Sequence, residues 1–257
     1  MLGAIAGDVI GSVYERNNTK QEDFELFFGR ISRFTDDTVL TCAVADAILS
    51  GVPYAEKLIE YYRLYPARGF GSGFSKWARN GGRSPYNSFG NGSAMRVSPT
   101  AYMHNNLEDT LIEAKKSAEV THNHPEGIKG AQATACAIFL ARKGEGKANI
   151  KKEIENRFGY FLDFDLEQLR KDYRFDVTCQ GSAPQAIYCF FISSNFEDAI
   201  RKAISIGGDS DTIACIAGGI AEAFYGGVPE YIKTETMKRL DDRLSGVVER
   251  FEELLYI

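Results

Sequence analysis

The sequence feature that most constrains the fold is a pair of acidic clusters, each followed by small apolar residues. Thr35-Asp36-Asp37-Thr38 precedes the apolar residues 39–45, and Asp209-Ser210-Asp211-Thr212 precedes residues 213–219. Both apolar stretches have the composition of buried helices. Carboxylates at the start of a buried helix need a partner for their charge, which the free N–H groups and the dipole of the helix supply only in part.

A simple alternative exists for each cluster, because Asp, Ser and Thr are favoured N-cap residues. A cap needs one such residue, whereas each cluster has two Asp flanked by hydroxyl groups, and the pattern occurs twice. No Cys or His stands beside them at ligand spacing, so the oxygen ligands favour Mg²⁺ or Mn²⁺ over Zn²⁺. We therefore predict one site for two divalent cations, with the clusters within about 10 Å of each other.

Helical periodicity extends over most of the chain, and strand signals are weak. We predict an all-α fold, a compact single-domain helical bundle over residues 1–257 with its small-residue helices in the middle. The polar residues 142–175 are expected to form a solvated helical excursion. The expected helices are 3–14, 37–50, 54–64, 73–80, 108–120, 126–143, 147–158, 183–193, 196–206, 211–225, 229–240 and 243–256.

Composition places the chain among globular proteins, with 44% hydrophobic residues, 25% charged residues and a net charge of −5. Its five Cys lie mostly in apolar segments without CxxC spacing, which indicates reduced core residues of a cytoplasmic protein. No segment has the length of a membrane span, and the N-terminus lacks the basic region of a secretory signal. We expect no membrane association and no stable nucleic-acid binding.

Residues 61–107 contain six basic residues and no Asp or Glu, although the chain as a whole is acidic. The same stretch is rich in glycine and aromatic residues and includes Gly90-Asn91-Gly92-Ser93. Glycine backbone approaches a phosphate closely, and successive N–H groups can cradle it. A flexible basic loop without a ligand is the alternative. The combination favours a pocket wall that binds an anion.

Five motifs together resemble those of the ADP-ribosylglycohydrolase family, and in particular of its dinitrogenase reductase-activating glycohydrolase type. They occur in the order of the family and extend over nearly the whole chain. In sequence order they are Gly3-Ala4-Ile5-Ala6-Gly7-Asp8 with Gly11-Ser12-Val13-Tyr14-Glu15, Phe34-Thr35-Asp36-Asp37-Thr38, Gly90-Asn91-Gly92-Ser93-Ala94-Met95-Arg96, Thr121-His122-Asn123-His124-Pro125, and Gly207-Gly208-Asp209-Ser210-Asp211-Thr212.

The resemblance implies an all-helical hydrolase with two Mg²⁺ or Mn²⁺ ions, which cleaves the glycosidic bond between C1″ of ADP-ribose and an acceptor. The acceptor would be a protein, a small molecule or a nucleic acid, and ADP-ribose would be a product. The implied metal ligands are Thr35, Asp36, Asp37, Asp209, Asp211 and Thr212. The implied substrate contacts are Gly90, Asn91, Gly92, Ser93 and His122. We assign catalytic roles to Glu15, Asp36 and Asp211.

Simpler roles remain open for several of these residues. Glu15 could instead be a surface residue that closes the first helix. His122 could instead lie at the entry to the helix at 126–143 without a role in binding. Asp8 is expected to cap or hydrogen-bond within a turn rather than bind metal, and Arg96 to support the glycine loop. Two other functions use the same parts: a phosphoester hydrolase with a binuclear metal centre, and a non-catalytic ADP-ribose-binding or structural relative.

Overall fold

Most helices of this chain begin where a side chain or a proline suits the first turn. The side chains of Thr35, Asn106, Asp165, Thr178 and Asn195 each accept a backbone N–H at the start of a helix. Three helices end at glycines in the left-handed region, where the absence of a Cβ removes the steric cost.

The computed structural model describes residues 1–29 and 31–255. Within these residues the chain forms 14 α-helices, one 3₁₀ helix and no strand, so the predicted all-α single-domain fold is confirmed. The elements are α1 (Leu2–Gly11), α2 (Asp36–Ser50), α3 (Tyr54–Leu64), α4 (Ser72–Arg79), α5 (Gly92–Met95), η1 (Ser98–Tyr102), α6 (Leu107–Glu119), α7 (Pro125–Arg142), α8 (Lys147–Phe158), α9 (Leu166–Asp172), α10 (Cys179–Phe191), α11 (Phe196–Ser205), α12 (Ser210–Tyr225), α13 (Glu230–Met237) and α14 (Asp242–Leu255).

The predicted boundaries differ from the observed ones by three or more residues at three helices, one of which is α13, which ends at Met237 rather than at residue 240. The first helix ends at Gly11 rather than at residue 14, so Glu15 lies in the turn that follows it. Helix α10 begins at Cys179 rather than at residue 183, because Thr178 caps it and Pro184 is accommodated inside the helix. The short elements α5, η1 and α9 were not predicted, since each has too few residues for a periodic pattern to be recognised.

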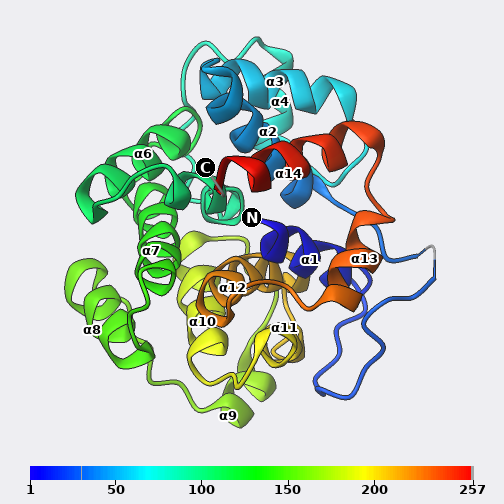
Figure 1. The fold of residues 1–257 in the computed structure, drawn as a ribbon, viewed down its shortest axis with the longest axis vertical. Coiled ribbons are helices and arrows are strands. Elements are labelled where there is room, and N and C mark those ends of the chain that lie inside the picture. Colours follow the sequence, from blue (N-terminus) through cyan, green and yellow to red (C-terminus); the bar gives the residue numbers. More distant parts are fainter. Residues whose placement is uncertain (30, 256–257) are drawn as a thin grey trace.

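Helices α1 and α12 lie side by side in the middle of the molecule (Figure 1). On α1 the contact is made by Gly3, Gly7 and Gly11, which are four residues apart, and any side chain there would collide with the partner backbone. A Cβ on Gly7 would lie 2.1 Å from the Ala214 carbonyl oxygen, and one on Gly11 would lie 2.5 Å from the Asp211 Cα. Helix α12 also contacts α7, α10 and α11, so the small-residue helices form the centre, as predicted.

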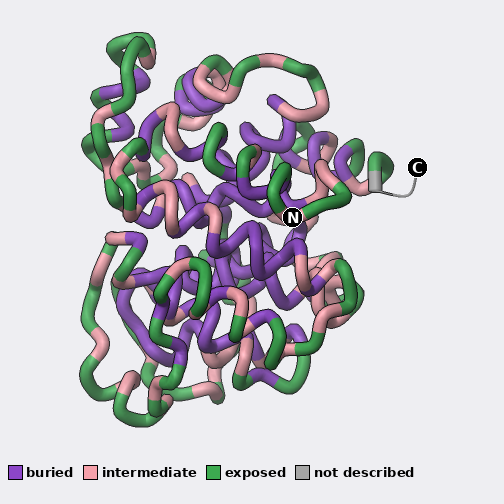
Figure 2. The backbone as a smooth tube through the Cα atoms, turned by 90° about the vertical axis from the view of Figure 1, so that its left-hand side faces the viewer, coloured by how far each residue is buried: buried purple, intermediate pink, exposed green. Residues whose placement is uncertain are grey.

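Burial follows the same arrangement, with buried segments inside and exposed loops outside (Figure 2). All five cysteines are buried and form no disulfide. The polar segment predicted at 142–175 folds as α8 and α9 on the outside of the bundle, where only Ile150 and Ile154 of the two helices are buried. In the part of the chain that the structure describes, no helix combines the length and apolarity needed to cross a membrane.

The close approach of α1 and α12 generates a prediction about Gly7. Changing Gly7 to Ala should destabilise the protein by about 3 kcal/mol, the upper end of the usual cost of overpacking, because the backbones must separate. The matched control is Gly246→Ala in α14, where a Cβ meets no atom within 4 Å. That change should stabilise by about 0.5–1 kcal/mol, as alanine does in a helix. Denaturant unfolding of both variants measures the difference, and equal stabilities would contradict close packing at Gly7.

Candidate functional site

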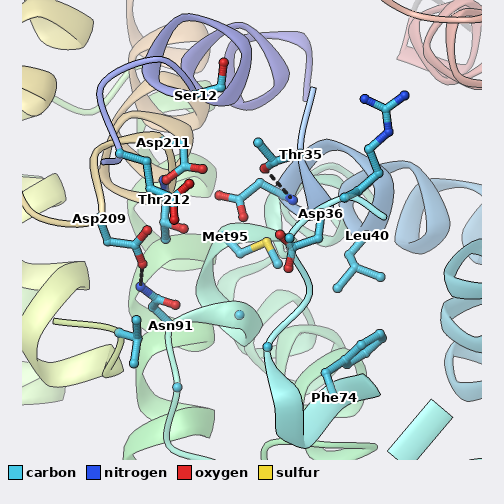
Figure 3. A pocket seen from close by; sticks show the side chains of 18 of the residues that line it. Ser12, Thr35, Asp36, Leu40, Phe74, Asn91, Met95, Asp209, Asp211 and Thr212 are labelled. Atoms are coloured by element: carbon cyan, nitrogen blue, oxygen red, sulfur yellow. Dashed lines mark hydrogen bonds between the residues drawn. The ribbon is translucent and has the colours of Figure 1, made fainter. Parts of the chain in front are cut away.

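A pocket of about 910 Å³ lies where the starts of α2 and α12 face each other. Figure 3 shows side chains of the two acidic clusters pointing into this space from opposite sides. The predicted site residues that line it are Glu15, Thr35, Asp36, Asp37, Gly90, Asn91, Gly92, His122, Asp209, Asp211 and Thr212. Eleven of the twelve predicted residues thus share one pocket, and Ser93 is the exception.

The first cluster is positioned by a carboxylate from α1. Asp8 is fully buried and accepts four hydrogen bonds from Thr35 and Thr38 at the start of α2. The backbone nitrogen of Thr35 lies 2.9 Å from Asp8 Oδ2, and that of Thr38 lies 3.0 Å from the same oxygen. The expectation that Asp8 forms hydrogen bonds is confirmed, although its partners belong to another helix rather than to its own turn. Asp8 thereby caps α2 from outside and leaves Asp36 and Asp37 free to face the pocket.

The second cluster depends on two glycines and an asparagine. Gly207 and Gly208 have φ values of 74° and 73°, in the left-handed region that favours glycine, and they turn the chain into α12. Asp209 then accepts a 2.7 Å hydrogen bond from the Asn91 side-chain amide, which also donates to the Ser182 hydroxyl. Asn91 was predicted to contact substrate, and the structure directs its amide to a carboxylate of the acidic cluster.

Burial raises the pKa of all four aspartates in the two clusters, and the charges of neighbouring aspartates add to this effect at Asp36, Asp37 and Asp211. For Asp36, burial together with the charge of Asp8 raises the pKa to about 8. Burial raises the pKa of Asp37 and that of Asp211 well above the ordinary value, and the neighbouring aspartates add to the effect. The pKa of Asp209 is raised by burial, an effect that the hydrogen bond from Asn91 opposes. A divalent cation bound among these carboxylates would offset their charge and lower their pKa values.

The donor atoms of this cluster fit divalent cations, which prefer oxygen ligands. Asp37 Oδ2 is buried without a hydrogen-bond partner. Asp37 and Thr212 come from different clusters and line the same pocket. Among the described residues, no three His, Cys, Asp or Glu side chains lie close enough to hold an ion as they stand. Carboxylates without a cation repel one another, and the Thr hydroxyls would supply further oxygens. The clusters meet as predicted, while metal ligation stays a prediction.

The glycine loop at 90–93 forms another side of the pocket and is held by backbone hydrogen bonds to the segment before α10. Asn91 N donates to the Val177 carbonyl at 2.7 Å, and Cys179 N donates to the Phe89 carbonyl at 2.8 Å. Gly90 and Gly92 line the pocket beside His122. Ser93 is buried behind this wall, where its hydroxyl donates to the Gly127 carbonyl at 2.7 Å.

Much of the acid-free stretch at 61–107 lines the same pocket, as predicted. It contributes Arg68, Phe74, Tyr86 and three glycines, at positions 69, 71 and 73. The Arg68 guanidinium lies 3.7 Å from the centre of the Phe34 ring, and the Arg68 carbonyl accepts the Asp36 N–H at 2.8 Å. This part of the pocket wall is therefore built largely of backbone, with a cation and aromatic rings beside it.

Glu15 stands at the pocket edge, half-buried in the turn after α1. Burial raises its pKa, and the charge of Asp209 adds to this effect, whereas Arg16 and Arg33 oppose it. Asn18, which the sequence did not single out, fastens this turn to the second cluster. Its side-chain amide donates to the carbonyls of Tyr14 and Gly208, and its Oδ1 accepts the Gly208 N–H at 2.8 Å. No spacing in the sequence links residues so far apart.

Comparison with known proteins agrees with this geometry. The ADP-ribosylglycohydrolase family model matches residues 1–256, so the chain belongs to this family. The chain is 29% identical to ADP-ribosylhydrolase ARH3 of Mus musculus, over 88% of this chain and 82% of that protein. It is 26% identical to ADP-ribosylarginine hydrolase Tri1 of Pseudomonas putida (strain GB-1), over 88% and 69% respectively.

A solved structure supports the fold independently. The structure described as an ADP-ribosylglycohydrolase-related protein complex superposes with a TM-score of 0.70 and covers 99% of this chain and 94% of its own. At 22% sequence identity, this similarity establishes the all-helical fold and nothing finer.

The raised pKa values predict how the stability of the metal-free protein depends on pH. Each folded-state carboxyl group holds its proton more tightly than it does in the unfolded chain, so the stabilisation from protonation is complete below about pH 4. It is lost as the pH rises through the folded-state pKa values, of which that of Asp36 is about 8. In EDTA the melting temperature should therefore fall between about pH 5 and pH 8, and fall less in Asp36→Asn.

The same carboxylates predict the effect of added metal. A divalent cation competes with protons for them, so Mg²⁺ or Mn²⁺ should raise the melting temperature more at about pH 8 than at about pH 5. Asp211→Asn should lose most of this gain. Glu56→Gln, an exposed change on α3 outside the pocket, should retain it. If added metal leaves the melting temperature unchanged at every pH, both clusters are helix caps and not metal ligands.

Proposed function

We propose that this chain is a metal-dependent hydrolase that releases ADP-ribose from a modified acceptor by cleaving the glycosidic bond at C1″. The observation that carries the proposal is the convergence of two acidic helix starts on one pocket that is also lined by a glycine-rich segment without acidic residues. Family membership adds the reaction class, since the relatives compared above are named as ADP-ribosylhydrolases.

Two divalent cations, Mg²⁺ or Mn²⁺, are the proposed cofactors. Their ligands would come from the oxygen atoms of the two clusters, and the orphaned Asp37 Oδ2 is the clearest candidate. When bound, such cations supply Lewis acidity towards ribose hydroxyls and a water molecule. The full proposed ligand set is Thr35, Asp36, Asp37, Asp209, Asp211 and Thr212.

The side chains around the cations divide the remaining work. Glycosidic cleavage develops positive charge at C1″, which Asp36 and Asp211 would stabilise from the pocket floor. Glu15 lies outside the clusters and has a raised pKa, so it is suited to exchange a proton with the attacking water or with the leaving group. Asn91 would act by holding Asp209 in place. Gly90, Gly92 and His122 would contact the anionic half of ADP-ribose, with Ser93 supporting their loop.

The acceptor and the subtype are finer parts of this proposal. The relatives named above do not include the dinitrogenase reductase-activating type, which remains a prediction from the motifs. An arginine acceptor has support from the name of the Pseudomonas putida relative. We also propose that residues 1–257 act as one catalytic domain in the cytoplasm, because both clusters and the glycine loop, far apart in the sequence, build one pocket.

A hydrolysis panel tests the proposal. Purified protein is incubated with ADP-ribosyl-arginine, ADP-ribosyl-serine, ADP-ribosylated nucleic acid and a simple phosphomonoester, each with Mg²⁺ or Mn²⁺, and released ADP-ribose or phosphate is quantified. Release of ADP-ribose from at least one substrate is expected. Release of phosphate alone would assign the site to phosphoester hydrolysis. Binding of ADP-ribose without turnover of any substrate would identify a non-catalytic relative.

Glu15 provides the sharpest test of the catalytic assignment. Glu15→Gln keeps the size of the side chain but removes its basicity, and acid–base assistance is typically worth roughly 10²–10⁴-fold. We expect kcat to fall by about that factor at saturating Mg²⁺, while ADP-ribose affinity changes far less. Glu56→Gln is the control and should keep normal turnover. A Glu15→Gln enzyme with near-normal kcat would leave proton transfer to the aspartates alone.

A further inference from the structure

Arg96 is a buried cation without an acidic partner. It follows α5 at the pocket wall and is fully buried, yet no described carboxylate forms an ion pair with it. Its Nη2 donates to the Ser117 carbonyl at 3.0 Å and to Thr121 Oγ1 at 2.7 Å, whereas Nε and Nη1 have no partner. Burial lowers its pKa to about 10, which leaves it charged at neutral pH. Such a charge is costly, and a hydrophobic side chain would remove the cost.

Thr121 connects this cation to His122, since Thr121 Oγ1 lies 2.7 Å from His122 Nδ1. The Thr121 hydroxyl has one proton and two acceptors within reach, His122 Nδ1 and the Ala118 carbonyl at 3.4 Å. That carbonyl already accepts the backbone N–H groups of Thr121 at 3.1 Å and His122 at 2.8 Å. Because a carbonyl oxygen has two lone pairs, the hydroxyl proton belongs to the short bond with Nδ1.

The direction of the hydrogen bond between Thr121 and His122 decides which ring nitrogen of His122 carries the proton. A neutral histidine whose Nδ1 accepts a hydrogen bond carries its proton on Nε2. Burial, reinforced by the charge of Arg96, lowers the pKa of His122 well below its ordinary value and keeps the ring neutral. Its Nε2 faces the glycine loop, since a Cβ on Gly92 would lie 3.4 Å from that atom. Within the described chain this N–H finds no protein acceptor.

We propose that Arg96 and Thr121 are positioning residues, which hold His122 as a neutral imidazole whose Nε2–H donates to a phosphate oxygen of the ligand. The inference rests on the proposed function, because ADP-ribose supplies the phosphate oxygens. An N–H donor requires an acceptor, and the uncompensated charge of Arg96 behind the wall favours an anionic one. Because Gly90 and Gly92 carry no Cβ beside His122 Nε2, a phosphate group of the ligand can approach this donor closely.

The tautomer is tested directly by nitrogen NMR of the imidazole rings in the ligand-free protein. The chain has three histidines, and His122 is assigned by its absence from the spectrum of His122→Gln. We expect a protonated Nε2 and an unprotonated Nδ1 in the wild type and in Thr121→Ser, which keeps the hydroxyl. Thr121→Val should lose this pattern. A proton on Nδ1 in the wild type would overturn the inference, whatever the protein hydrolyses.

The link to the ligand is tested by titrating the same proteins with ADP-ribose and with adenosine, which lacks phosphate. Thr121→Val should weaken ADP-ribose binding roughly tenfold to a hundredfold, as expected for a lost hydrogen bond to a charged group. Thr121→Ser should bind it nearly as the wild type does, and adenosine should not distinguish the two variants. Equal losses for both ligands would mean a merely structural role. If the wild-type protein does not bind ADP-ribose, the proposed function is wrong. The NMR experiment would still decide the tautomer of His122.

Arg96 is tested by a matched pair of variants. Arg96→Lys keeps the charge and a donor for Thr121, whereas Arg96→Met fills the space without either. We expect Arg96→Met to lose roughly tenfold or more in ADP-ribose affinity without a lower melting temperature, because it removes an unpaired buried charge. Arg96→Lys should lie closer to the wild type. Equal affinities of the two folded variants would overturn the role of the charge, and an unfolded Arg96→Met would assign Arg96 to the core instead.

Discussion

The position of both acidic clusters depends on α1. One face of this helix carries Asp8, which accepts the hydrogen bonds of the first turn of α2. Another face is a stripe of glycines, and it lies against α12 at backbone distance. Because the same rigid helix touches the start of α2 and the first half of α12, it sets the separation between the two groups of carboxylates. Hydrogen bonding fixes one side of the pocket and close packing fixes the other.

This arrangement brings carboxylates together against their own repulsion. The free N–H groups at the helix starts offset part of the cost, yet the pKa values of the aspartates remain raised. Packing of the small-residue core around α12 stabilises the fold and offsets the unfavourable repulsion between the carboxylates. A pocket that is strained in the absence of a ligand is typical of sites that bind cations, since the binding energy replaces the missing charge.

Local signals in the sequence were sufficient for the helices and for the identity of the acidic clusters. The cap at Thr35 and the paired glycines before Asp209 each act within a few residues, so a spacing rule can detect them. The relations between distant segments were not predictable in this way. Nothing near Asn91 indicates that its amide reaches Asp209, and nothing near Asp8 indicates α2. Ser93 shows the same limit, because a one-residue change along α5 turns a side chain from the pocket into the core.

The glycine-rich part of the pocket wall has a consequence for how this protein diverges from its relatives. Five of its lining residues are glycines, at positions 69, 71, 73, 90 and 92. A surface of this kind presents peptide N–H and C=O groups, whose positions follow from the path of the chain and not from side-chain identity. Replacing a neighbouring side chain leaves these peptide N–H and C=O groups in place. Inserting or deleting one residue shifts every peptide group that follows it in the loop. Changes of ligand preference along this wall should therefore be recorded as gaps in sequence alignments rather than as substitutions.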